Sequence, residues 1–161
     1  MKEKGVTKIA LILLVLVCVF AIVACSDNVN TDGVVYVSYD TYAVVTGYIG
    51  TESDVKIAAF YKDLPVIRIE NKAFYNCRSL TSVTIGNNVK SIGYGAFSNC
   101  RSLKTVYYKG TAADWGKISI GSNNSYITNT KRYYYSESKP TGSGNYWHYV
   151  DGKPTVWTSD E

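Results

Sequence analysis

The chain has 161 residues, a length that suits one small domain, and a net charge of +4. Fifteen Tyr, thirteen Gly and a single Met are typical of short strands and turns rather than of a helical protein. Three lysines and one glutamate in the first eight residues supply +2 of the charge, and no Lys/Arg stripe follows, which argues against a nucleic-acid partner.

Residues 1–25 have the pattern of an export signal. A basic start precedes an apolar run from Ile9 to Ala24, and this run of about 16 residues is shorter than the roughly 20 that a membrane-spanning helix needs. The run ends Ile22-Val23-Ala24-Cys25, which resembles a bacterial lipobox. The resemblance implies a diacylglycerol on Cys25 and cleavage before it, so the membrane becomes a partner through a lipid anchor.

Two alternatives stay open for this segment. An ordinary signal peptide cut near Ala24 would release a soluble protein, and an uncleaved segment would itself hold the chain in the membrane. The polar residues after Cys25 predict a flexible tether. The expected organisation is a lipoprotein signal peptide at 1–24, a lipidated Cys and tether at 25–40, a repeat domain at 41–135 and an aromatic tail or hairpin at 136–161.

Strand-like alternation begins at Val34, and a repeat with a period of 23 residues follows in the centre of the chain. The run AFYNCRSL starting at Ala73 recurs as AFSNCRSL starting at Ala96, so Phe74 corresponds to Phe97. A fixed period of this length is typical of a solenoid, in which one coil cannot bury its apolar side alone.

The period-2 pattern within each copy predicts a short strand with one buried side. Leu80, Val83 and Ile85 are expected to face inward, and Ser82 and Thr84 outward. Further segments fit the same phase: Val89 and Ile92 form a second apolar stretch, and Val55 and Ile57 match Val83 and Ile85 after an insertion of about five residues. We therefore expect a mostly β solenoid of about three coils with a parallel strand ladder.

The pattern I-G-x-x-A-F-x-x-C-x-x-L-x-x-V-x-I resembles the BspA-type leucine-rich repeat of bacterial surface proteins. In the second copy it is carried by Ile92, Gly93, Ala96, Phe97, Cys100, Leu103 and Val106. Glu70 replaces the Gly in the coil before, and Tyr108 stands where the pattern has Ile. The resemblance implies a right-handed solenoid, display on the cell surface and adhesive or protein-binding roles.

Cys77 and Cys100 hold equivalent places one coil apart. A coil spacing of about 4.8 Å would allow a disulfide, and export would permit its formation. Equivalent side chains in a stack point in parallel, however, and Cys also fills small core sites, so a ladder of free thiols is the favoured interpretation and a disulfide the alternative. Two Cys without a nearby His are too few ligands for a metal site.

The residues after the repeat predict a cap and an aromatic hairpin. Thr111 and Asp114 have the spacing of a capping box, and the apolar residues that follow would cover the open end of the solenoid. After a strand at Tyr133–Tyr135 and a linker, Asp151-Gly152 would turn a hairpin between 145–150 and 153–157. This tail either packs on the solenoid as an aromatic C-terminal cap or offers a stacking surface for sugar or choline, because its W-x-Y-x-D-G run is similar to choline-binding repeats. The candidate stacking residues are Tyr146, Trp147, Tyr149 and Trp157.

No pattern in the chain predicts catalysis. His148 is the only histidine and lies between two aromatic residues without a nucleophile motif nearby. The acidic residues are not paired for acid–base work, and no glycine-rich phosphate loop is present in the sequence. We expect a protein that is not an enzyme and that needs no cofactor or metal.

The expected function is protein binding or adhesion on the exposed side of the strand ladder, with an extracellular or envelope protein, including one on a host surface, as partner. The candidate residues on that side are Lys56, Ser82, Thr84, Lys104, Thr105 and Tyr107. Two alternatives belong to other classes: a glycan-binding module that uses the C-terminal aromatics, and a structural envelope protein without a specific ligand.

Overall fold

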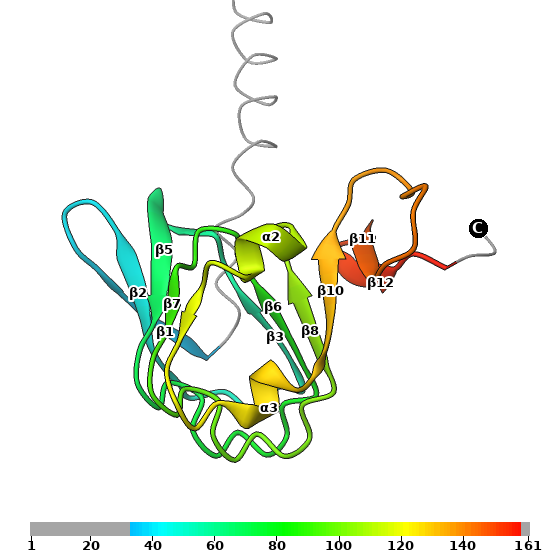
Figure 1. Cartoon of the computed structure of the whole chain (residues 1–161). Helices are drawn as coiled ribbons and strands as arrows, with labels where there is room; N and C mark the ends of the chain where they lie inside the picture. Colours follow the sequence, from blue (N-terminus) through cyan, green and yellow to red (C-terminus); the bar gives the residue numbers. More distant parts are fainter. Residues whose placement is uncertain (1–32, 159–161) are drawn as a thin grey trace, which may run out of the picture.

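The computed structural model describes residues 33–158, so the predicted signal, Cys25 and the first half of the predicted tether segment, up to residue 32, lie outside the described range. Within that range no helix is long and apolar enough to cross a membrane. The chain winds as a solenoid, and its coils contribute strands to two separate sheets (Figure 1). This is the mostly β repeat architecture that the 23-residue period predicts.

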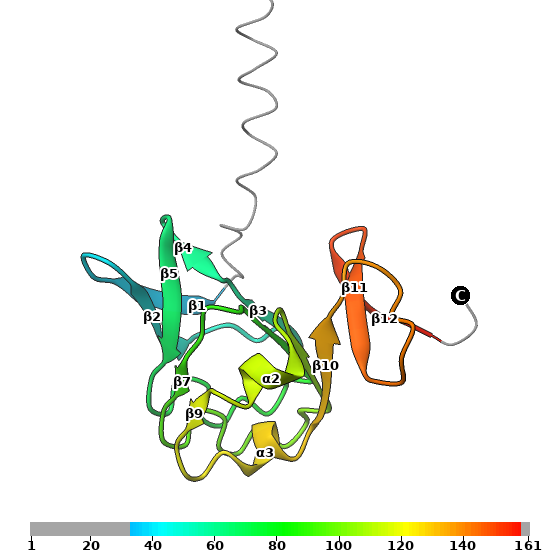
Figure 2. The same cartoon turned by 45° about the horizontal axis from the view of Figure 1, so that its top comes forward.

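One sheet, which we call the ladder sheet, forms one side of the coils and continues into the C-terminal tail. Its order is β3 (Asp54–Ile57), β6 (Ser82–Ile85), β8 (Thr105–Tyr108), β10 (Lys131–Tyr135), β11 (Tyr146–Val150) and β12 (Lys153–Val156). The strands from β3 to β11 are parallel, and β12 returns antiparallel to β11. The predicted hairpin is therefore confirmed, and it extends the ladder sheet beyond β10 (Figure 2).

The second sheet lies on the other side of the coils. Its order is β1 (Val34–Ser38), β2 (Ala43–Tyr48), β5 (Leu64–Ile69), β7 (Ser91–Ile92) and β9 (Ser119–Ile120), with β4 (Phe60–Tyr61) paired to β5. β1 pairs antiparallel with β2 over its whole length. Val34–Ser38 forms the edge strand of this sheet, as the strand-like alternation from Val34 predicts, although this segment lies within the 25–40 range expected for the lipidated Cys and tether.

The ladder sheet contains one more coil than the repeat motif indicates. The insertion in the first coil is confirmed, because Val55 pairs with Val83 and Ile57 with Ile85. Four successive parallel strands, β3, β6, β8 and β10, line up in register, where the sequence predicts about three coils. The coil between β8 and β10 has lost the repeat motif and contains α2 (Ala112–Trp115) and α3 (Ser125–Thr128) instead.

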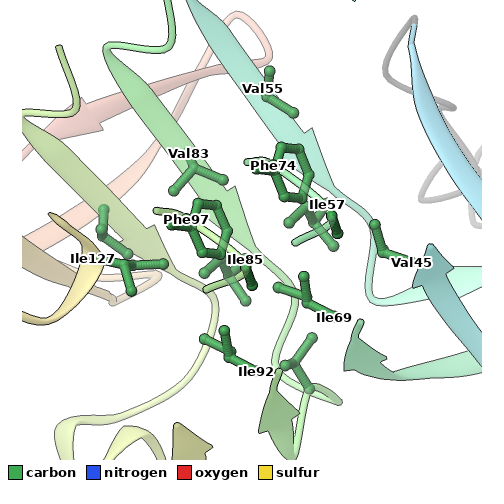
Figure 3. Close-up of a cluster of buried hydrophobic side chains, with 14 of the residues drawn as sticks. Val45, Val55, Ile57, Ile69, Phe74, Val83, Ile85, Ile92, Phe97 and Ile127 are labelled. Atoms are coloured by element: carbon green, nitrogen blue, oxygen red, sulfur yellow. The ribbon is translucent and has the colours of Figure 1, made fainter. Parts of the chain in front are cut away.

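The core consists of the repeat positions stacked from coil to coil. The Phe74 and Phe97 rings lie 4.9 Å apart at an interplanar angle of 3°, and both side chains are completely buried. Figure 3 shows Phe97 between Phe74 and Ile127, so an isoleucine fills the corresponding space in the last coil. The predicted inward positions of β6, Val83 and Ile85, are also buried.

Asn124 joins the last coil to the one before it. Its Nδ2 donates to the carbonyls of Gly93 and Gly121 at 2.8 Å each, and its Oδ1 accepts from the Phe97 amide at 2.9 Å. The side chain is only 3% exposed, and these bonds satisfy the backbone groups that it covers. A polar side chain therefore connects the last coil, which lacks the apolar repeat motif, to the coil before it.

The last coil also closes the end of the stack as expected. Thr111 and Asp114 form the predicted capping box, in which the Thr111 hydroxyl accepts from the Asp114 amide at 3.1 Å and the Asp114 carboxylate accepts from the Thr111 amide. Trp115 and Ile118 are buried beneath this turn. The aromatic ring of Trp115 packs edge-on against Tyr108, 5.3 Å between centroids, so the lid contacts the last motif-bearing strand directly.

Both repeat cysteines are free thiols, in agreement with the favoured interpretation. Cys100 is completely buried, and its Sγ donates to the Phe74 carbonyl at 3.1 Å. A hydrogen bond with the Cys77 thiol, together with burial, raises the pKa of Cys100. Cys100 therefore stays protonated and acts as a small core residue.

Candidate functional site

A groove of about 600 Å³ lies between the outer face of the ladder sheet and the start of β12. The residues that line it are Asp54, Val55, Lys56, Thr81, Ser82, Thr84, Lys104, Thr105, Tyr107, Tyr149, Gly152, Lys153 and Pro154. The volume falls within the usual range for ligand pockets. All six residues predicted for the exposed ladder face are among them.

The floor of the groove consists of two rows of side chains that cross the ladder strands. Strand pairing places Asp54, Ser82 and Thr105 in one row, and Lys56, Thr84 and Tyr107 in the next. Because side chains alternate along a strand, both rows belong to the outer face. The outward direction expected for Ser82 and Thr84 is therefore confirmed by the groove that they line.

Thr84 differs from the expectation in its exposure. The sequence predicts a solvent-exposed position, whereas the side chain is only 4% exposed. Its row neighbours are the longer side chains of Lys56 and Tyr107, and a short residue between two long ones is covered from both sides. Thr84 contributes to the bottom of the groove rather than to its rim.

Asp54 supplies the one acidic side chain of the lining, and hydroxyl groups hold it in place. Ser82 Oγ donates to its carboxylate at 2.6 Å, Ser53 Oγ at 2.9 Å and Thr81 Oγ1 at 3.4 Å. The hydrogen bond from Ser82 is the main cause that lowers the pKa of the Asp54 carboxyl, with smaller contributions from Ser53 and Thr81. The carboxylate is thus ionised at neutral pH and engaged at the edge of the groove.

The wall of the groove comes from the C-terminal hairpin. Its turn, Asp151-Gly152, has φ angles of 49° and 75°, the left-handed conformation that a tight two-residue hairpin turn requires. The turn places Lys153 and Pro154 opposite the ladder strands. The predicted D-G hairpin therefore forms one side of the groove, which its local sequence alone does not indicate.

Trp147 anchors this hairpin to the solenoid. The side chain is completely buried, and its Nε1 donates to the Tyr108 carbonyl at 3.0 Å. Its ring lies 5.4 Å from Tyr107 and 5.2 Å from Tyr135, both on ladder strands. Trp147 therefore fits the interpretation that the tail packs on the solenoid, and not the interpretation that it offers a stacking surface for a ligand.

The four predicted stacking residues do not form one open platform. Trp147 has no exposed surface, which contradicts its assignment to a sugar-stacking face, because the ladder aromatics surround its ring. Trp157 instead stacks on His148 with centroids 3.7 Å apart, and its Nε1 donates to the Ser136 carbonyl. Tyr146 lies beside Trp147 in β11 and does not line the groove, so Tyr149 alone of the four is a lining residue.

The aromatic rings of the groove already have neighbours. Lys56 Nζ lies 5.4 Å from the centroid of the Tyr149 ring, and Lys109 Nζ lies 5.6 Å from it. Tyr107 stacks against Tyr133 at 5.8 Å. The Tyr149 ring therefore positions lysine ammonium groups, and the Tyr107 ring packs on a neighbouring strand. Both contacts compete with the stacking of a sugar on these rings.

Positive charge predominates along the groove. Lys56, Lys104 and Lys153 line it against the single carboxylate of Asp54. Lys104 and Lys153 are exposed, and they come from the floor and the wall respectively. An anionic group in the groove would therefore meet lysine side chains from two sides.

The sequence alone misses the contribution of Lys153, Pro154 and Thr81 to this site. The period-2 pattern identifies which ladder residues face outward, but the wall depends on how β11 pairs with β10 across the loop 136–144. Within residues 33–158, no group of three or more His, Cys, Asp or Glu side chains is placed to hold a metal ion.

Comparison with known proteins places the repeat in a family. A family model described as BspA type Leucine rich repeat region (6 copies) matches residues 55–137, which extends from β3 to just beyond β10. A comparison with curated proteins finds no match.

The chain is similar to three solved structures of leucine-rich repeat proteins. A leucine rich cell surface protein from Faecalibacterium prausnitzii A2-165 is 28% identical, with a TM-score of 0.50 over 64% of this chain and 29% of that one. A leucine rich repeat protein from T. pallidum is 25% identical, with a TM-score of 0.46 over 52% of this chain and 43% of that one. A leucine-rich repeat protein from Bacteroides capillosus ATCC 29799 is 24% identical, with a TM-score of 0.43 over 68% of this chain and 72% of that one. The chain spans less than half the length of the first two.

Proposed function

Because this chain belongs to the BspA-type leucine-rich-repeat family, we propose that it is a bacterial cell-surface protein that binds an extracellular or envelope protein and is not an enzyme. The observation that carries the proposal is the groove, in which six outward ladder residues and the hairpin wall meet. The cell-surface relative from Faecalibacterium prausnitzii supports the location. A rigid ladder with a side wall is a suitable base for recognition by side chains.

Filling the groove is expected to abolish adhesion. Thr105 is a partly exposed floor residue, and the substitution Thr105→Trp would occupy the space of a ligand without touching the core. Beads coated with the purified protein should bind host or bacterial surfaces, and Thr105→Trp should reduce this binding about tenfold or more. Thr141→Trp is the matched control, because Thr141 is exposed in the loop 136–144 and does not line the groove.

Enzymatic treatment of the target surface separates the classes of partner. Protease treatment should remove the binding, and glycosidase treatment should leave it. Binding that survives protease but is lost after deglycosylation would favour the glycan-binding alternative. Equal binding by Thr105→Trp and wild type would exclude the groove, and no binding to any surface would favour a purely structural envelope protein.

We propose in addition that Cys25 carries the lipid anchor that holds the domain at the membrane. The lipobox-like run before Cys25 supports this assignment. Cells that express the chain and are fed a clickable fatty acid should label it, and Cys25→Ala should lose the label. Cys18→Ala, in the same segment, is the control and should keep it. Label that persists in Cys25→Ala would contradict the lipid assignment.

A further inference from the structure

The charged side chains around the groove indicate which kind of ligand it can bind. Ser82 and Ser53 donate to the Asp54 carboxylate at 2.6 Å and 2.9 Å, so the protein's own hydroxyl groups stabilise this negative charge. The lysines have the opposite role, because Lys104 and Lys153 are exposed and line the same space from two elements. The excess of positive charge in a concave site attracts anions.

The hydrogen-bonding groups of the floor make a neutral saccharide a poor match. Ser82 and Thr81 already donate to Asp54, and Thr84 is almost fully buried. Tyr149 has lysine ammonium groups near its ring, and Tyr107 stacks on Tyr133. The hydroxyls of Ser82 and Thr81 and the rings of Tyr107 and Tyr149 thus already have partners, so the positive charge is the main feature left for recognition.

The geometry of the floor matches an extended polypeptide. The two rows of outward side chains are separated by two residues along each strand, which is about 6.6–6.8 Å. Alternate side chains of an extended peptide have the same spacing, so every second side chain of such a peptide can follow the two rows. Such a peptide would lie against side chains, because the backbone groups of β6 are paired with β3 and β8 on both sides.

We propose that the groove binds a short, extended acidic segment of the partner protein, with Asp or Glu carboxylates placed between Lys104 and Lys153. This inference rests on the proposed protein-binding function and adds the chemistry of the segment that is recognised. Lys56, held above the Tyr149 ring, lies farther along the same floor and gives the segment a third positive neighbour.

Charge reversal with a charge-matched control tests the proposal. The probe is a fluorescent peptide of alternating Glu and Ser, and its binding to the full exported chain is followed by anisotropy at low and physiological salt. The double variant Lys104→Glu with Lys153→Glu should weaken binding about tenfold or more, since two attractions become repulsions. Lys90→Glu with Lys139→Glu makes the same change in net charge at exposed lysines outside the groove and should change binding less than about twofold.

Two further probes determine whether the segment is a polypeptide. A peptide of alternating Gln and Ser should not bind, and uronate or sulfated oligosaccharides should compete poorly with the acidic peptide. The proposal is overturned if both double variants weaken binding equally, if the Gln peptide binds as well as the Glu peptide, or if the oligosaccharides bind more tightly. If Thr105→Trp abolishes adhesion while the groove charge reversal leaves it unchanged, the groove function stands and the acidic segment is excluded.

Discussion

Replacing Phe97 by Ala is expected to lower the free energy of unfolding by about 3–5 kcal/mol. Phe97 has no exposed surface, and its ring stacks on Phe74 with centroids 4.9 Å apart. It belongs to a central coil, so the cavity would remove contacts with the coils on both sides. A small domain has a total stability of about 5–15 kcal/mol, which makes this loss a large fraction of it.

Denaturant unfolding followed by circular dichroism measures this loss. Phe60→Ala is the matched control, because Phe60 is the same residue type but is 42% exposed at the short strand β4. The double variant Phe74→Ala with Phe97→Ala should cost less than the sum of the two single changes, since the rings share one contact. A Phe97→Ala variant that is as stable as Phe60→Ala would mean that the stacked rings do not hold the coils together.

The repeat positions explain why so much of this fold is predictable. Phe74 and Phe97 occupy the same phase of a 23-residue period, and that phase alone assigns each of them to the core. The coil after Tyr108 has no such signal. Its packing depends on Ile127 and on the hydrogen bonds of Asn124, residues whose role appears only when the coils are stacked. Local pattern therefore identifies the motif-bearing coils and predicts the cap and the final strand, but it does not show that these form a fourth coil in register with the others.

The groove was predictable only in its floor. Alternation along β6 and β8 shows that Ser82 and Tyr107 face outward, and the structure places both in the lining. The wall depends on a contact across 39 residues, the hydrogen bond between the Trp147 side chain and the Tyr108 carbonyl. No local spacing encodes such a contact. The same bond explains why an aromatic residue that looks suited to ligand stacking is instead a buried anchor.

Trp147→Ala is expected to release the C-terminal hairpin while the solenoid stays folded. β11 is joined to β10 by two register pairs, at Tyr134 and Tyr135, and an isolated two-stranded hairpin is marginally stable in water. Loss of a fully buried Trp costs about 3–5 kcal/mol, and here the cost is expected to fall on the local docking of the hairpin. The groove would lose Lys153 and Pro154 together.

Native-state hydrogen exchange can locate this loss within the fold. The amides of Tyr134 and Ser136 donate to hairpin carbonyls and should lose protection in Trp147→Ala, whereas the Lys109 amide, bonded to the Ile85 carbonyl, should keep it. Tyr75→Ala is the control, since Tyr75 is an aromatic residue that is 51% exposed and lies outside the hairpin. Loss of protection at Lys109 would show that the hairpin supports the whole solenoid. Unchanged protection at Ser136 would show that Trp147 is not its anchor, and the acidic peptide should then still bind. If the hairpin is released, binding of that peptide should fall as it does on charge reversal, because the wall contributes one of the two exposed lysines.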